Sequence, residues 1–161
     1  MKKVIWDSML DADLNVRYWS YLSRRYYMRD KYSKIFLAAM SSGTVASWHF
    51  WATVPGVWKG LSAFSALTAI ALPIINWSKM IENMVRLKQQ WVDIKNDYEM
   101  LWISFKNKNK NDADIEKEIL RVKKKEVETS KEEYNLPNSK KLVYKCTDEV
   151  LKSRGIDKKG G

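Results

Sequence analysis

The residues best suited to bind a ligand lie in one short stretch, residues 17–34 (RYWSYLSRRYYMRDKYSK), here called the basic-aromatic segment. It interleaves six Lys or Arg residues with six Tyr or Trp residues. Guanidinium groups beside aromatic rings bind nucleotides or single-stranded nucleic acid through charge and stacking. The same mixture suits a helix that contacts anionic lipid headgroups, and this second interpretation is the favoured one. The residues expected to bind a ligand or to control gating are Arg17, Arg24, Arg25, Arg29, Tyr26 and Tyr27.

Catalytic chemistry is not indicated by the sequence. One His and one Cys are too few for a zinc cluster, and no hydrolase, zinc-protease or phosphate-loop motif is present. We therefore expect no catalytic residue, no metal and no cofactor. Cys146 has no second cysteine to pair with, in keeping with a reducing compartment. His49 is interpreted either as an ordinary interfacial polar residue or as a proton-sensitive group at a pore mouth.

Two uncharged runs dominate the sequence after the basic-aromatic segment. No Asp, Glu, Lys or Arg occurs between Lys34 and Lys59, nor between Lys59 and Lys79. A bilayer core of about 30 Å is crossed by roughly 20 helical residues, the length that each run supplies. The sequence thus predicts an all-α fold with a two-span membrane hairpin at residues 35–78. A buried helical hairpin in a soluble domain is the alternative, because the first run is rich in Ser and Thr and the mean hydropathy of the chain is -0.47.

The flanks of the two runs favour the membrane. Tryptophans gather at the predicted turn, and tyrosines with Trp77 gather at the opposite end, as aromatic residues do at two membrane interfaces. Lys59 is the one basic residue in the turn, whereas both outer flanks are strongly basic. This bias predicts a multi-pass protein of the bacterial inner membrane with both termini in the cytoplasm. No signal peptide is expected, because residues 1–34 are charged throughout.

The rest of the chain is predicted to be helical and cytoplasmic. Residues 1–34 form one helical segment, and residues 79–153 form a bundle or coiled-coil-like arm before a flexible tail at 154–161. Asp112 or Asp114 is the expected N-cap of a helix that starts after the polar break at 106–112. A stripe at three- and four-residue spacing predicts the buried face of the helix before this break. Its members are Ile81, Met84, Trp91, Ile94, Tyr98, Leu101 and Phe105.

Small and polar residues in the two runs suggest how the spans assemble. Ala39, Gly43 and Ser47 recur every four residues and predict a face for close helix approach, either inside one hairpin or between copies. Ser65, Leu72 and Asn76 lie on one semi-polar stripe of the second run. Because two spans alone offer little shelter for such groups, we expect a homo-oligomer in which this stripe lines a pore.

The layout resembles that of the SLATT family of small bacterial membrane effectors with two transmembrane helices. The resemblance covers about residues 10–130 and rests on RRYYMRDKYSK, on the hairpin and on WVDIKNDYEMLW after it. It implies a pore-forming effector of anti-phage defence, encoded beside a nucleotidyltransferase or a nucleotide-sensing domain, and it implies no catalytic residue. No fused sensor domain is expected from this sequence. The family's basic-aromatic motif falls on Arg24, Arg25, Tyr26, Tyr27, Arg29, Lys31 and Tyr32.

The expected function is therefore an oligomeric pore-forming effector that depolarises the cell or arrests its growth. Its gate would respond to a cytoplasmic signal, an acidic nucleotide or oligonucleotide made by a cognate nucleotidyltransferase. Its expected partners are this ligand, the lipid bilayer and further copies of the chain. The alternatives are a membrane-anchored, non-conducting module that binds nucleic acid or a partner protein, and a holin-like toxin.

Overall fold

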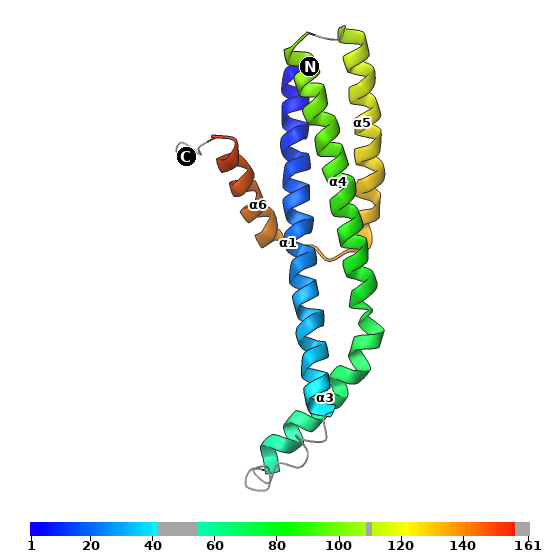
Figure 1. Cartoon of the computed structure of the whole chain (residues 1–161), viewed down its shortest axis with the longest axis vertical. Helices are drawn as coiled ribbons and strands as arrows, with labels where there is room; N and C mark the ends of the chain where they lie inside the picture. Colours follow the sequence, from blue (N-terminus) through cyan, green and yellow to red (C-terminus); the bar gives the residue numbers. More distant parts are fainter. Residues whose placement is uncertain (42–54, 109–110, 157–161) are drawn as a thin grey trace. The chain divides into compact units, whose positions relative to one another are not determined.

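The computed structural model describes residues 1–41, 55–108 and 111–156, and in these ranges the chain is all-α. This part of the prediction is confirmed. A short 3₁₀ helix, η2 (Glu133–Asn135), follows the fourth of the five α-helices (Figure 1). The α-helices are α1 (Lys2–Ser41), α3 (Pro55–Ile75), α4 (Trp77–Lys106), α5 (Asp112–Glu132) and α6 (Lys140–Ser153).

The chain divides into two compact units. The first, here called the bundle unit, comprises Met1–Ser23 and Glu82–Gly161, and the second unit comprises Arg24–Ile81. The basic-aromatic segment is therefore divided between them, because residues 17–23 belong to the bundle unit and residues 24–34 to the second unit. The boundaries predicted at residues 34 and 79 stay predictions.

In the bundle unit, α1, α4 and α5 pack side by side and α6 lies along α1 (Figure 1). Helices α1 and α4 run antiparallel, since Trp6 lies beside Trp102 at one end of the pair and Trp19 and Trp91 share an acceptor toward the other, whereas α1 and α5 run in the same direction (Figure 1). The stripe predicted on α4 is buried at five of its positions, with Leu87 joining it, because residues three or four apart share one helix face. Those five positions are Met84, Trp91, Ile94, Tyr98 and Leu101.

Interactions between residues close in sequence determine where helix α5 begins and ends. The Asn111 side chain accepts a hydrogen bond from the Asp114 backbone N–H at 2.8 Å. Asn111 is therefore the N-cap, and the predicted cap at Asp112 or Asp114 is wrong. The two aspartates lie in the first turn instead, where carboxylates favour the positive end of the helix. After Glu132 the chain tightens into η2, and Leu136 then adopts an extended conformation before Pro137.

The second unit pairs the end of α1 with α3. The rings of Phe36 and Phe64 meet edge to face with their centroids 5.6 Å apart, and the Lys34 ammonium lies 3.5 Å from the Ser78 hydroxyl. Among the residues that the structure describes, no helix has both the length and the apolar character that a bilayer crossing requires. The centre of the first predicted span, residues 42–54, lies outside the described residues.

The α4 core gives a direct test of the bundle unit. Ile94 is 2% exposed, whereas Ile103 on the same helix is 52% exposed. Ile94→Ala should lower the free energy of unfolding by about 2–5 kcal/mol, since it leaves a cavity in the core. Ile103→Ala is the matched control and should change it by less than about 0.5 kcal/mol. Urea unfolding followed by circular dichroism measures both values, and equal losses would contradict the assigned buried face.

Candidate functional site

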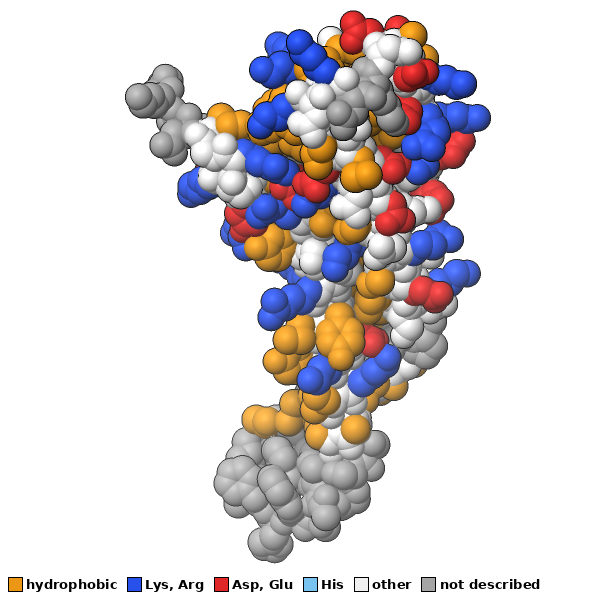
Figure 2. Space-filling model, turned by 45° about the horizontal axis from the view of Figure 1, so that its top comes forward, with side chains coloured by type: hydrophobic (Ala, Val, Ile, Leu, Met, Phe, Trp, Pro, Cys, Tyr) orange, Lys and Arg blue, Asp and Glu red, His pale blue; other side chains and the backbone are white. Residues whose placement is uncertain are grey.

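The predicted ligand-binding residues of the second unit lie on α1 and face solvent. Arg24, Arg25, Arg29 and Tyr27 are exposed and Tyr26 is half-buried. The Arg29 guanidinium lies 5.5 Å from the centre of the Tyr26 ring. None of the three arginines forms an ion pair with a described residue, so their charge is available to an external anion. Figure 2 shows Lys and Arg side chains interspersed with hydrophobic ones on the face that it draws.

Arg17 has a different environment, in the bundle unit. Its guanidinium lies 3.4 Å from the Asp13 carboxylate and 3.8 Å from that of Glu149, and it donates to the Ser153 hydroxyl at 3.2 Å. Arg17 is thus half-buried among internal partners. Its predicted role in ligand binding or gating requires that an external anion replace them.

The aromatic residues next to Arg17 also have structural roles that the sequence did not indicate. Tyr18 and Trp19 are buried in the bundle core. The Tyr18 hydroxyl accepts from the Ser139 backbone N–H at 3.0 Å and donates to the Asn138 side chain at 3.3 Å. The first part of the basic-aromatic segment therefore packs against the chain that links α5 to α6 and does not present stacking rings to solvent.

One carboxylate oxygen joins three parts of the bundle unit. Glu133 Oε1 accepts hydrogen bonds from Trp19 Nε1 at 3.2 Å and from Trp91 Nε1 at 2.7 Å. A buried indole needs a partner for its N–H group, and a charged acceptor gives a strong one. Sequence analysis missed Glu133, because its partners are 114 and 42 residues away in the chain and no local spacing relates them.

A second charged network was also missed. Asp13 is 4% exposed, and its carboxylate lies 3.3 Å from the Lys95 ammonium as well as beside Arg17. Lys95 also lies 3.9 Å from Glu99, whose carboxylate is 3.3 Å from the Arg154 guanidinium. A buried carboxylate needs such partners, because an unpaired one would lose its hydration without compensation. The spacing of four residues within the Asp13–Arg17 pair and within the Lys95–Glu99 pair is the local sequence signal for this cluster.

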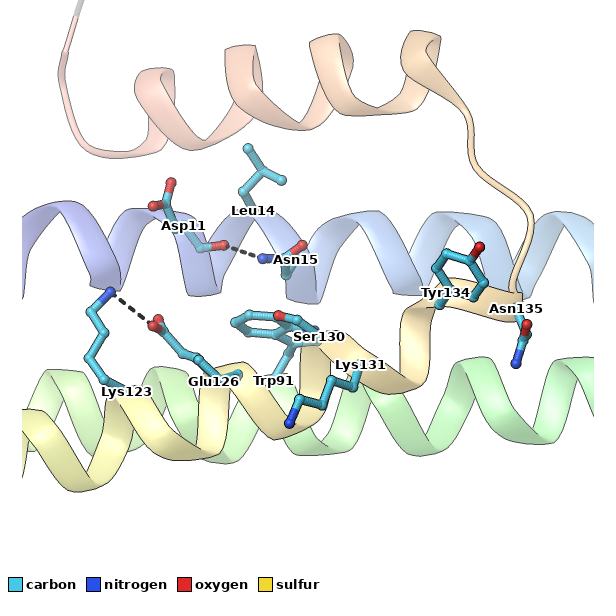
Figure 3. Close-up of a pocket in the computed structure, with 11 residues that line it drawn as sticks. Asp11, Leu14, Asn15, Trp91, Lys123, Glu126, Ser130, Lys131, Tyr134 and Asn135 are labelled. Atoms are coloured by element: carbon cyan, nitrogen blue, oxygen red, sulfur yellow. Dashed lines mark hydrogen bonds and ion pairs between the residues drawn. The ribbon is translucent and has the colours of Figure 1, made fainter.

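A groove of about 800 Å³ lies between α1 and α5, with Trp91 of α4 behind it (Figure 3). Two carboxylates, Asp11 and Glu126, and two ammonium groups, Lys123 and Lys131, line it. Lys123 already pairs with Glu126 at 2.9 Å. Because these four charges cancel, the groove has no preference for a ligand of either sign.

Two groups around Glu126 have raised pKa values. Loss of hydration, and secondly the Glu126 carboxylate, raise the pKa of Asp11. Burial raises the pKa of Tyr98 in the same way, again with Glu126 as the next cause. Tyr98 is fully buried, and Ser8 and Glu126 are the polar side chains that face its hydroxyl. The surroundings of Glu126 therefore favour the neutral forms of Asp11 and Tyr98.

A second cavity, of about 650 Å³, lies at the end of the bundle where α5 begins. Lys2, Lys106 and Lys108 surround the apolar side chains of Trp102 and Ile115 there. The lysines are exposed, and the N-cap and acidic first turn described above already meet the positive end of α5. Neither cavity therefore adds a ligand-binding residue to those on α1.

The predicted pore-lining residues are placed in part. Ser65 is half-buried on α3, and the side chain of Leu72 lies outside the described part of the structure. Asn76 stands between α3 and α4 with a φ of 46°, and its side-chain oxygen accepts from the Lys79 backbone N–H at 3.3 Å. Asn76 is therefore the N-cap of α4, a role that explains its polarity without a pore.

The predicted helix-packing face is described at one position. Ala39 is exposed on α1, whereas Gly43 and Ser47 lie outside the described residues, as does His49. Close packing through these small residues stays a prediction. No cluster of His, Cys, Asp and Glu side chains that could hold a metal ion occurs in the described ranges.

Comparison with known proteins gives no relative for this chain. No protein-family model matches the sequence, and searches of curated proteins and of solved structures also found no match. The resemblance to the SLATT family therefore stays a prediction that rests on the quoted segments.

Glu133 can be tested by removing its charge alone. Glu133→Gln keeps the size of the side chain but replaces the carboxylate that two indoles share. The free energy of unfolding should fall by about 1.5–3 kcal/mol, the usual contribution of a hydrogen bond to a charged group. Glu128→Gln makes the same change at an exposed position of α5 and should have almost no effect. Urea unfolding followed by tryptophan fluorescence compares them, and equal effects would argue against the shared acceptor.

Asp11 gives a prediction for pH dependence. Its pKa in the folded chain lies above the ordinary value of 3.8. Below pH 3.8 the neutral Asp11 side chain contributes its full stabilisation to the folded chain. This stabilisation is lost as the pH rises through the folded pKa, because the carboxylate must then ionise. Asp11→Asn should raise the free energy of unfolding near pH 7 by less than about 1 kcal/mol, because the group is partly exposed and screened by solvent. The gain in unfolding free energy from Asp11→Asn should vanish near pH 3, where Asp11 is itself neutral. A gain that persists at pH 3 would show that ionisation of Asp11 is not its cause.

Proposed function

We propose that this chain is a membrane-anchored helical effector whose second unit inserts into the bilayer while the bundle unit remains in the cytoplasm. In this proposal several copies assemble and open an ion-conducting pore. The observation that carries it is the exposure of large apolar side chains on the second unit. Lipid, or a second copy of the chain, would cover them.

The apolar surface of α3 is extensive for a helix in water. Phe64, Leu67 and Ile70 are 60%, 67% and 64% exposed, and Ile35 on α1 is 52% exposed. Moving such a side chain out of water is worth about 1.5–3 kcal/mol when it becomes fully buried. Residues 60–78 carry no charged side chain that would oppose transfer into lipid. Together these features favour a lipid or intersubunit environment over exposure to water.

Basic residues flank this surface in the way that an inserted hairpin requires. Arg24, Arg25 and Arg29 precede the apolar end of α1, and Lys79 follows α3. The exposed guanidinium groups fit contact with anionic headgroups on the cytoplasmic side. We therefore propose the bacterial inner membrane as the location, with both termini in the cytoplasm.

The proposed trigger is an acidic nucleotide or oligonucleotide that binds Arg24, Arg25 and Arg29 beside Tyr26 and Tyr27. In support, these arginines form no ion pair with any residue that the structure describes, and the rings beside them offer stacking surfaces. The role in anti-phage defence rests on the resemblance to the SLATT family. We expect pore opening to depolarise the cell or arrest its growth.

The capping role of Asn76 favours a second candidate, a membrane-anchored module that binds nucleic acid or a partner protein and conducts no ions. A polar side chain within the second uncharged run suggested a pore lining, yet its hydrogen bond to Lys79 accounts for that polarity. The two candidates share the anchor and differ in conduction. Measurement of ion flux therefore separates them.

The membrane proposal is tested with the full chain in two steps. After expression in bacteria, the protein should stay in the membrane pellet through alkaline carbonate extraction, whereas a soluble bundle would be released. Purified protein in liposomes of anionic lipid should then dissipate an imposed potassium gradient. Release by carbonate rejects the anchor, and retention without flux supports the non-conducting module.

Variants locate the gate and the pore. Arg24→Glu combined with Arg25→Glu should leave insertion intact and abolish the response to an acidic nucleotide. Asn76→Gly retains the left-handed turn, since glycine tolerates a positive φ, and removes the polar side chain. It should reduce ion flux without preventing assembly. Unchanged flux for Asn76→Gly would remove this residue from the proposed pore.

A further inference from the structure

The carboxylate of Glu149 makes several of the polar contacts between helix α6 and α1. The Tyr21 hydroxyl lies 3.0 and 3.1 Å from the two carboxylate oxygens of Glu149 and donates to this group. The Arg17 guanidinium lies 3.8 Å from the same carboxylate, and the Lys145 ammonium lies 4.1 Å from the centre of the Tyr21 ring. The Glu149 carboxylate of α6 thus lies against Arg17 and Tyr21 of the basic-aromatic segment. An external anion could bind these two groups if Glu149 were absent.

The apolar contact of α6 is small. Of its side chains, all of which are described, Cys146 and Val150 are buried, whereas Tyr144 is 77% exposed. Helices α1, α4 and α5 each bury more side chains than α6 does. A helix that buries two side chains and otherwise docks through polar groups is among the first parts of a bundle to open.

Each charged side chain beneath α6 keeps at least one ion-pair partner when α6 leaves. Asp13, the buried carboxylate, is bound by Arg17 from α1 and by Lys95 from α4. Glu99 likewise retains Lys95 when it loses Arg154, which follows α6. Release therefore exposes no unpaired buried charge, the main electrostatic cost that would otherwise prevent it.

We propose that α6 is a releasable cover over α1, in which Glu149 occupies an anion-binding surface formed by Arg17 and Tyr21. In the closed state, α6 and the chain before it cover Arg17, Tyr18 and Tyr21. Within the basic-aromatic segment, the ligand-binding residues that then remain accessible to solvent lie in residues 24–34. Release of α6 adds Arg17 and Tyr21 to the groups available to an anion. This regulation applies to the bundle unit and does not depend on membrane insertion or on conduction.

Cys146 reports the position of the cover. It is the one cysteine of the chain and lies on the buried face of α6, where it is 0% exposed. Burial also raises the pKa of its thiol. In the closed state a thiol reagent therefore reacts slowly for two reasons, because it cannot reach the sulfur and because little thiolate is present. The rate at which an aromatic disulfide reagent modifies Cys146 therefore measures the population of the released state.

The experiment uses the full chain in mild detergent at fixed pH. Tyr21→Phe removes the hydrogen bond and should raise the rate of Cys146 modification roughly ten- to a hundredfold, the effect of losing one hydrogen bond to a charged group. Glu149→Gln keeps an acceptor oxygen but removes its charge and should raise the rate roughly tenfold, the difference between a charged and a neutral hydrogen bond. Their effects should not add fully in the double variant, because both act on the same bond. Glu128→Gln on α5, the matched loss of one exposed carboxylate, should leave the rate unchanged.

Salt and urea separate release from unfolding. Raising sodium chloride from about 0.05 M to about 0.5 M should speed modification of the wild type more than that of Glu149→Gln, since it screens the contact that this variant lacks. Low urea should change the rate little, because a local opening exposes little surface. The proposal fails if modification follows global unfolding across the urea range, or if Glu149→Gln and Tyr21→Phe react no faster than Glu128→Gln.

Discussion

The bundle unit depends most on one shared acceptor, the carboxylate of Glu133. Its oxygen receives the indole N–H groups of Trp19 from α1 and of Trp91 from α4, while Glu133 itself follows α5. A core of three packed helices can slide along its apolar stripes with little change in buried area. Two directional hydrogen bonds to one atom remove that freedom, because only one register satisfies both donors.

The structure could be predicted from the sequence where the deciding interactions are local. The spacing of Met84, Trp91 and Tyr98 is enough to identify the buried face of α4, since helix geometry alone sets it. The N-cap of α5 was misplaced by one residue or more because several polar side chains compete there, and Asn111 makes the bond. The two-span hairpin follows from hydropathy, and it remains a proposal.

The candidate site shows why a composition pattern can mislead. Residues 17–34 form one continuous basic and aromatic stretch in sequence, yet Trp19 is buried against Glu133 and Arg17 pairs with Asp13 and Glu149. Apart from Asp13, which is four positions from Arg17, these partners lie 114 to 132 positions away, at distances that no local motif records. Arg24 and Arg25 remain exposed, so the part of the segment available to a ligand is shorter than the pattern indicated.

The cap at Asn76 has a consequence for the order in which the chain folds. The first backbone bond of α4 runs from the Met80 N–H to the Asn76 carbonyl, and the Asn76 side chain satisfies a further N–H of the first turn. Helix α4 thus begins on its own signals and does not extend the hydrogen-bond ladder of α3. The bundle unit can therefore form its helices without α3, and in the proposed membrane-anchored effector a chain that has not yet inserted would already carry a finished bundle unit.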